Sequence, residues 1–268
     1  MSEDEADLRR AARRALLSVD LTNLEETCDE AAATALARRA ITDFGAVSAV
    51  CVWPRFVALA HGLLAHQGVK VATVVNFPGG DEDSGEVADL TGRAVEDGAS
   101  EIDVVIPYVD FLEGNEEAVI AEIKRVRRAA GPGVRVKAIL ETGALETNER
   151  IGKAAGLAIK GGADFLQSST GAIAADATLR ATRMMLEAIL AAEAPVGLKP
   201  AGGIRTAREA ANYLALADEV MGADWATPAT FRIGASEELL DALIETLSDG
   251  DEAEAEAAPR AAGPGGQA

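Results

Sequence analysis

The sequence is poor in aromatic residues and cysteine, and it has no long apolar run. Aromatic residues make up 4% of its 268 residues, so aliphatic side chains must fill the core; hydrophobic residues reach 49% in all. No apolar run approaches the roughly 18 residues of a membrane-spanning helix, and the acidic N-terminus does not resemble a signal peptide. Cys28 and Cys51 are too few for a disulfide framework. We therefore expect a cytoplasmic protein without a membrane partner.

Lysine and positive charge in general are also scarce. The chain has 44 acidic residues against 25 basic ones, a net charge of −19, and only six of the basic residues are lysines. Such a surface repels nucleic acid and anionic membranes, so neither is an expected partner. Acidic surfaces of this kind suit proteins that stay soluble in concentrated salt, where screening weakens the self-repulsion. The composition therefore predicts a halophilic source.

Strand-like apolar runs alternate with alanine-rich helical patterns along most of the chain. This alternation requires parallel strands joined by helical crossovers. Eight units within this length favour a single (β/α)8 barrel (TIM barrel) over an open doubly wound sheet. The strand-like runs cover residues 15–21, 47–53, 69–77, 101–107, 134–141, 163–169, 196–200 and 231–235, and the helical patterns cover 54–68, 84–98, 116–131, 148–162, 175–193 and 206–217.

The two ends of the chain differ from the barrel in composition. Residues 1–14 have the charge pattern of an exposed helix that leads into the barrel. From residue 249 the sequence is rich in Ala, Glu, Gly and Pro and lacks apolar periodicity, which is typical of disorder. We therefore expect a charged N-terminal helix (1–14), one α/β barrel domain (15–248) and a disordered acidic tail (249–268).

Several polar residues lie inside the predicted strands, where they are costly to bury. The two-residue alternation of a strand places Asp103, Lys137 and Gln167 on inward-facing positions, and Lys199 ends a later strand. These residues are expected to meet at the C-terminal end of the barrel. One interpretation is a satisfied buried ion-pair network. The other is a reactive site, because a desolvated lysine beside a second cation has a lowered pKa and attacks carbonyls.

Glycine-rich turns follow three neighbouring strands of the predicted barrel. They cover residues 168–171, 200–206 and 233–236. Barrels often bind phosphate at the loops after the last strands, through backbone N–H groups and a helix N-terminus. The three turns together predict a phosphate pocket.

The motifs at these positions resemble the deoxyribose-phosphate aldolase family. They include DLTNL (20–24), EIDVVIPY (101–108), GADFLQSSTG (162–171), VGLKPAGGIRT (196–206) and FRIGAS (231–236), and the resemblance covers about residues 15–245. It implies a TIM-barrel class I aldolase that needs neither metal nor another cofactor. It further implies cleavage of 2-deoxyribose 5-phosphate to glyceraldehyde 3-phosphate and acetaldehyde. Barrels of this family are often homodimers, so a homodimer is expected too.

The resemblance assigns roles to individual residues. Asp103 matches the family's proton-relay aspartate, and Lys199 matches the second lysine of the site. Cys51 matches a cysteine close to the reactive aldehyde. Together with the inward-facing Lys137, the positions assigned to substrate binding are Asp20, Thr22, Cys51, Thr170, Gly171, Gly202, Gly203, Gly234 and Ser236.

Three residues depart from the family pattern around one site. Gln167 stands where the Schiff-base lysine is expected, and an amide cannot form an imine. Ala172 replaces a lysine that often follows the STG motif. Glu237 replaces the second serine of the final motif, and its carboxylate would repel a phosphate.

These departures leave three interpretations open. In the first, the chain is an aldolase in which Lys199, or else Lys137, forms the imine and Asp103 moves the proton. Loss of the neighbouring cation then raises the pKa of Lys199 and slows the reaction at neutral pH. In the second, the carbonyl substrate is different and Gln167 donates a hydrogen bond to it. In the third, the barrel binds a ligand or a partner without catalysis.

Overall fold

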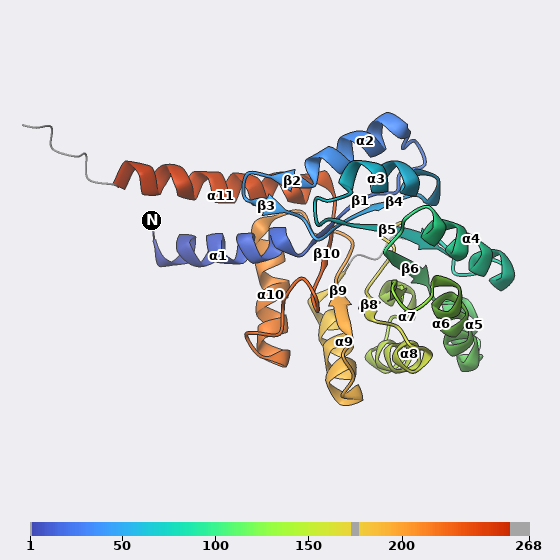
Figure 1. Ribbon diagram of the computed structural model, residues 1–268. Coiled ribbons are helices and arrows are strands. Elements are labelled where there is room, and N and C mark those ends of the chain that lie inside the picture. The colour runs from blue at the N-terminus through green and yellow to red at the C-terminus, as the bar shows by residue number, and fades with distance from the viewer. Residues whose placement is uncertain (1, 173–176, 258–268) are drawn as a thin grey trace, which may run out of the picture.

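Eight parallel strands form a closed barrel in the computed structural model, which describes residues 2–172 and 177–257 (Figure 1). The hydrogen-bonded order is β10-β1-β4-β5-β6-β7-β8-β9. Parallel bridges from Leu198 to Phe231 and from Ala201 to Gly234 join β9 to the β10 region and close the ring. The prediction of a (β/α)8 barrel is confirmed. The strands are β1 (Val19–Asn23), β4 (Ala49–Val52), β5 (Lys70–Val75), β6 (Glu101–Val105), β7 (Arg135–Ile139), β8 (Phe165–Gln167), β9 (Gly197–Lys199) and β10 (Ile233–Ala235).

Helices surround the barrel and follow nearly every strand (Figure 1). Several begin with a side-chain cap; Thr147, Thr178 and Thr206, for example, each accept a hydrogen bond from a backbone N–H of the first turn. The helices are α1 (Glu3–Leu17), α2 (Glu30–Arg39), α3 (Val57–Leu64), α4 (Ser84–Glu96), α5 (Tyr108–Leu112), α6 (Glu116–Ala130), α7 (Thr142–Leu145), α8 (Asn148–Gly161), α9 (Leu179–Ala192), α10 (Ala207–Met221) and α11 (Glu237–Ala257), with a 3-10 turn at Pro54–Phe56.

The core lies in two layers, one between the strands and the helices and one inside the barrel. The outer layer is almost entirely Ala, Val, Leu and Ile. Small and branched aliphatic side chains let helices approach strands that are buried on both faces. This packing explains how the chain builds a large core with few aromatic residues. A separate small cluster inside the barrel contains Cys51, Ala72 and Val74.

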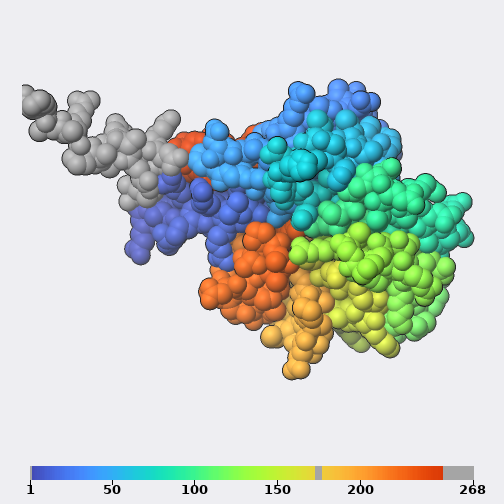
Figure 2. All heavy atoms as spheres, in the orientation of Figure 1, coloured from blue at the N-terminus to red at the C-terminus, as the bar shows by residue number. Residues whose placement is uncertain are grey.

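The N-terminal helix is longer than predicted and packs on the barrel wall. Helix α1 runs to Leu17, so residues 15–17, expected to begin the first strand, are helical. Ala12, Ala15 and Leu16 are all fully buried, because they continue one apolar face of the helix. Figure 2 shows α1 (blue) lying against α10 (orange), and Arg14 pairs with Asp218 of α10 at 2.6 Å.

Further elements differ from the predictions. Helix α11 continues to Ala257, so it passes the domain boundary predicted at residue 248 and enters the first residues of the predicted tail. Ala and Glu both have high helix propensity, and this outweighs the lack of an apolar stripe. Residues 258–268 of the predicted tail lie outside the described residues. A short antiparallel pair, β2 (Ile41–Thr42) and β3 (Gly45–Ala46), and helix α2 were not predicted.

No helix within the described part of the chain is long and apolar enough to cross a membrane.

Candidate active site

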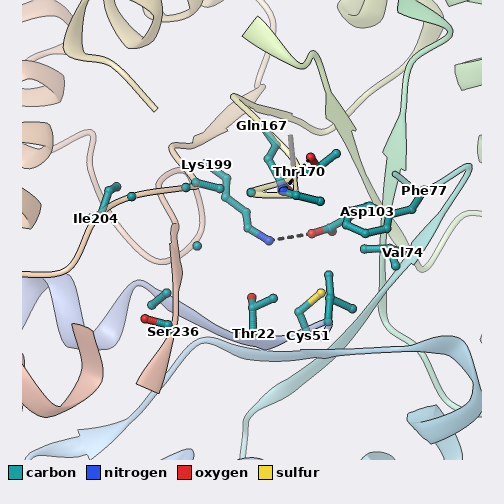
Figure 3. A pocket seen from close by; sticks show the side chains of 18 of the residues that line it. Thr22, Cys51, Val74, Phe77, Asp103, Gln167, Thr170, Lys199, Ile204 and Ser236 are labelled. Atoms are coloured by element: carbon teal, nitrogen blue, oxygen red, sulfur yellow. Dashed lines mark hydrogen bonds and ion pairs between the residues drawn. The ribbon is translucent and has the colours of Figure 1, made fainter. Parts of the chain in front are cut away.

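A cavity of about 410 Å³ opens at the C-terminal ends of the barrel strands. Seven of the eight strands contribute a lining residue, because parallel strands of a barrel all end on the same face. Figure 3 shows the side chains of Lys199 and Asp103 meeting in this cavity. Gln167 and Thr170 lie on one side of the pair, and Thr22 and Cys51 on the other.

The two sides of the cavity differ in polarity. On one side β4, β5 and the segments after β1 and β5 contribute Cys51, Val74, Leu24 and Phe77, which are apolar or weakly polar. On the other side β8, β9 and the following turns contribute mainly polar groups, including the amide of Gln167. A ligand with one hydrophobic and one hydrophilic edge would match these two walls.

Lys199 is held by two carboxylates at the base of the cavity. Its Nζ lies 2.6 Å from Asp103 Oδ2 and 3.1 Å from Asp20 Oδ2, and its side chain is 2% exposed. Gly234 of β10 gives the lysine stem room, since a Cβ there would lie 3.4 Å from Lys199 Cε and only 2.6 Å from Ala201 Cβ. Glycine is therefore needed where β10 passes Lys199.

Lys137 lies beneath this pair and extends the charge network. Its Nζ is 2.6 Å from Glu101, 2.8 Å from Asp103 and 3.3 Å from Asp20. Asp103 and Lys137 are register partners on β6 and β7, so their side chains enter the barrel side by side.

Arg232 completes the network from the last strand segment. It lies 2.6 Å from Asp20 and 2.9 Å from Glu101. Three carboxylates (Asp20, Glu101 and Asp103) thus face three cations (Lys137, Lys199 and Arg232), and the buried cluster is formally neutral. Buried charges persist only when they are paired in this way.

The charge balance fixes the protonation of Lys199. Burial alone would lower the pKa of this lysine, but the carboxylates of Asp103 and Asp20 outweigh burial and hold the pKa above its usual range. Burial would likewise raise the pKa of Asp20, yet Lys137, Lys199 and Arg232 lower it. This direction is opposite to the lowered lysine pKa that the reactive-site interpretation assumed.

Gln167 fills the position expected for the Schiff-base lysine. It ends β8, and its register partner on β9 is Lys199. The side chain is buried, Nε2 donates a hydrogen bond of 3.1 Å to the carbonyl oxygen of Ser169, and Oε1 has no hydrogen-bond partner. The amide is thus oriented with its nitrogen toward the β8 turn. The amide atom without a partner is thus the acceptor Oε1, whereas the second of the three interpretations assigns Gln167 the role of a donor.

The glycine-rich turns meet at the mouth of the cavity. Gly171, Gly202 and Gly203 line it, and all three have positive φ angles, between 72° and 94°, that glycine adopts without strain. Ser168 and Ser169 tie two of these turns together, since both hydroxyls donate to the carbonyl oxygen of Ala201. The predicted pocket of bare backbone groups is therefore assembled at one place.

Two charged residues near these turns affect how well the predicted pocket would bind a phosphate group. Arg205 lines the cavity. Glu237 is engaged elsewhere: its Oε2 lies 2.7 Å from Arg39, and it is not among the described residues that line the cavity. The repulsion expected from this carboxylate is weakened by that pairing.

Most residues singled out in the sequence come together here. Those that line the cavity are Thr22, Cys51, Asp103, Gln167, Thr170, Gly171, Lys199, Gly202, Gly203, Gly234 and Ser236. Asp20 and Lys137 were assigned to substrate binding but lie behind Asp103 and Lys199, so they would act on a ligand only through that pair. Burial raises the pKa of Cys51 to about 12, so its thiol stays protonated at neutral pH.

Glu101 and Arg232 belong to this buried network but were not predicted from the sequence. The signal was present, because Glu101 precedes Asp103 by two positions and Arg232 precedes Gly234 by two, which places each pair on one strand face. Glu141 holds the nearby turn from outside the cavity by accepting a 3.0 Å hydrogen bond from Thr170 N. Within residues 2–172 and 177–257, no three His, Cys, Asp or Glu side chains are grouped as metal ligands.

Comparisons with known proteins point to one family. The sequence model of the DeoC/LacD family aldolase matches residues 5–256. A deoxyribose-phosphate aldolase of Agrobacterium fabrum is 47% identical over 248 residues, which is 92% of this chain and 95% of that protein. A crystal structure assigned to a deoxyribose-phosphate aldolase of Toxoplasma gondii ME49 superposes with a TM-score of 0.84 at 27% identity, covering 90% of this chain and 97% of that one. One assigned likewise from Coccidioides immitis gives 0.77 at 27% identity, covering 88% and 86%.

Proposed function

Because the chain belongs to the DeoC/LacD family of aldolases, we propose that it is a carbon–carbon lyase that forms its imine on Lys199. The reaction is cleavage of 2-deoxy-D-ribose 5-phosphate to D-glyceraldehyde 3-phosphate and acetaldehyde, a step of deoxyribonucleotide and carbohydrate catabolism. One observation carries the proposal: Lys199 Nζ reaches the cavity and lies 2.6 Å from Asp103 Oδ2. Amine and proton shuttle are thus in contact at the place where a carbonyl carbon would sit.

Lys199 is better placed for this chemistry than Lys137. Among the described residues that line the cavity, Lys199 is the only lysine. Lys137 is fully buried behind it and lies within 3.3 Å of three carboxylates, Asp20, Glu101 and Asp103, which raise its pKa although burial would lower it. A lysine without access to the cavity cannot attack a substrate carbonyl. Lys137 instead serves as a fixed positive charge beside Asp103.

The proposed mechanism uses Lys199 as nucleophile and Asp103 as proton carrier. The neutral amine adds to carbon 1 of the open-chain sugar and expels water, which leaves an iminium ion. As the bond between carbons 2 and 3 breaks, its electron pair moves to the iminium nitrogen, and the carbon 3 hydroxyl passes its proton to Asp103. Glyceraldehyde 3-phosphate leaves; carbon 2 of the enamine is then protonated, and water releases acetaldehyde and the free amine.

The other end of the cavity suits the phosphate group. Gly171, Gly202 and Gly203 bring backbone groups close to the ligand, and Ser236 precedes helix α11. Arg205 adds a positive charge that it shares with Glu238, whose Oε2 lies 3.4 Å from Arg205 Nε. Ala172 contributes no charge there, so we propose weaker phosphate binding than a lysine at that position would give.

The proposal also includes the compartment, the oligomeric state and the salt concentration in which the enzyme works. Cys28 and Cys51 are both free thiols, which fits the reducing cytoplasm. We also propose a homodimer and a salt-rich environment, the latter on the net charge of −19. No metal or organic cofactor takes part in the proposed steps.

The proposal is tested by retro-aldol activity of Lys199→Met. Purified protein in concentrated KCl is given 2-deoxyribose 5-phosphate, and glyceraldehyde 3-phosphate is measured with a coupled enzyme at pH 7 and pH 10. The variant should lose at least about a thousandfold in kcat, because no other lining amine can replace the nucleophile. Lys153→Met, which removes a half-exposed lysine on α8, is the matched control. Equal activity of Lys199→Met and the control would overturn the assignment of the imine to Lys199.

A further inference from the structure

Glu141, which follows β7, combines three features that are each unfavourable. Its side chain is fully buried. Its backbone is left-handed, with φ 51° and ψ 60°, a conformation that residues other than glycine seldom adopt. Burial raises the pKa of its carboxyl above the usual range, although hydrogen bonding from Thr170 lowers it in part. Strain and burial at one residue point to a task for its side chain.

The carboxyl of Glu141 binds the turn that follows β8. Its Oε2 accepts a 3.0 Å hydrogen bond from the backbone N–H of Thr170. The neighbouring Thr142 N donates a 2.8 Å hydrogen bond to the carbonyl oxygen of Ser168. Two consecutive residues after β7 thus hold this turn, one at its beginning and one in its middle.

The turn after β8 forms part of the cavity wall where the phosphate group is proposed to bind. Thr170 and Gly171 both line the cavity. The N–H of Thr170 is directed at Glu141, and the N–H of Ala172 donates a 3.1 Å hydrogen bond to Thr170 Oγ1. The amide of Gly171 lies between these two amides in the chain, so the hydrogen bonds on either side fix its direction. Without the bond to Glu141, the peptide group of Thr170 would be free to rotate.

We propose that Glu141 is a positioning residue for the phosphate end of the substrate, because it fixes the turn after β8 so that the Gly171 amide can bind the phosphate. The inference rests on the proposed function and adds a residue that sets the selectivity for phosphorylated over unphosphorylated sugar. Glu141 acts through the turn alone, since it is not among the described residues that line the cavity. It therefore takes no part in the steps on Lys199 and Asp103.

The feature that this role requires is the hydrogen-bond acceptor, not the charge. A protonated carboxyl and an amide can each present an oxygen to the Thr170 N–H, as a carboxylate does. A neutral group is also more favourable near a phosphate, because like charges repel. Glu141→Gln should therefore keep the turn in place. Glu141→Met keeps the length of the side chain but removes the acceptor, so the Thr170 N–H loses this partner.

The test compares two substrates that differ only in the phosphate group. Cleavage of 2-deoxyribose 5-phosphate and of 2-deoxyribose is followed through acetaldehyde, the product that they share, and the ratio of the two kcat/KM values is the readout. In Glu141→Met we expect this ratio to fall about tenfold or more, chiefly through a higher KM for the phosphorylated sugar. In Glu141→Gln the ratio should stay within about threefold of the wild-type value, because the hydrogen bond to Thr170 is kept.

The outcomes separate this inference from the proposed function. An unchanged ratio in Glu141→Met, or a ratio that falls equally in Glu141→Gln, overturns the inference, while cleavage by wild type keeps the aldolase function. If Glu141→Met fails to fold, Glu141→Asp decides: aspartate tolerates the left-handed backbone, but its shorter side chain draws the acceptor back from Thr170, so the ratio should fall. No cleavage of either substrate by wild type overturns both.

Discussion

The side chain of Gln167 is neutral, so it adds no charge to the buried cluster around Lys199. With Gln167 the buried cluster holds three carboxylates and three cations, so removing a proton from Lys199 leaves a net negative charge in a buried place. The pKa of Lys199 is accordingly raised above 10.5 by Asp103 and Asp20, against the effect of burial. At pH 7 Lys199 is therefore held in its protonated form. If Lys199 is the nucleophile, as proposed, we expect the enzyme to be slow at neutral pH and to gain rate as pH rises.

The first residue-scale prediction concerns Gln167→Lys. A third lysine gives the cluster one excess positive charge, so the pKa of Lys199 should fall and its amine form should appear at lower pH. We expect kcat/KM for 2-deoxyribose 5-phosphate at pH 7.5 to rise at least about tenfold. In wild type the rate should keep rising with pH toward and beyond pH 10, while the variant should level off earlier.

The measurement is a pH–rate profile of both proteins at constant ionic strength. Gln167→Met serves as control, because it alters the side chain without adding charge. If the two profiles have the same shape, charge balance does not govern the reactivity of Lys199.

Sequence spacing was sufficient to bring the residues of the proposed site together but not to predict their protonation. Strand alternation and the motifs placed Asp103, Gln167 and Lys199 in one cavity, where the structure has them. The pKa direction depends on Asp20, which comes from β1 at the other end of the chain. Contacts between residues so far apart in sequence follow from barrel closure and are not visible in any local pattern.

At the scale of elements, buried ion pairs inside the barrel connect strands that are far apart in the sequence. Arg232, beside the short strand β10, pairs with Asp20 on β1 and Glu101 on β6. Replacing it leaves two buried carboxylates that have lost a counter-charge. Breaking a buried ion pair from one side is strongly destabilising, whereas exposed pairs contribute little.

We therefore predict that Arg232→Met lowers the free energy of unfolding by about 3–5 kcal/mol. The measurement is urea denaturation at fixed KCl concentration. Arg208→Ala is the matched control, since Arg208 pairs with Asp4 between α10 and α1 but is 53% exposed; its loss should cost about 0–1 kcal/mol. Equal effects of the two substitutions would show that the buried network does not stabilise the barrel.

The ends of helices and strands were predicted less well from the sequence than the helices and strands themselves. Residues 15–17 were predicted to begin a strand because Ala15, Leu16 and Leu17 are apolar. Ala15 and Leu16 are instead buried residues of helix α1, which packs against α10 and α11. Helix α11 extends to Ala257 although its last turns have no apolar stripe. In both cases tertiary packing or intrinsic propensity overrides a pattern read over a short window.

The molecule as a whole carries an excess of negative charge. Its net charge is −19, while the buried cluster of the active site is neutral, so the excess lies on the rest of the protein. Repulsion between these charges opposes folding at low ionic strength and is screened by salt within about 10 Å at 0.1 M and 3 Å at 1 M.

We predict that the melting temperature rises steadily between 0.1 M and 2 M KCl. Thermal unfolding followed by circular dichroism measures this. NaCl at equal concentration is the control and should act similarly, because the effect is one of screening. A melting temperature that falls or stays constant over this range would argue against the proposed salt-rich environment.

The central claim, an imine on Lys199, is tested most directly by chemical trapping. Wild type, Lys199→Met and Gln167→Lys are incubated with acetaldehyde at pH 9 in concentrated KCl and reduced with borohydride, and the adduct is located by peptide mapping. Our account predicts an adduct on Lys199 in wild type, none in the active site of Lys199→Met, and an adduct on a lysine at position 167 or 199 in Gln167→Lys. A wild-type protein that turns over substrate but yields no adduct on Lys199 would contradict the account.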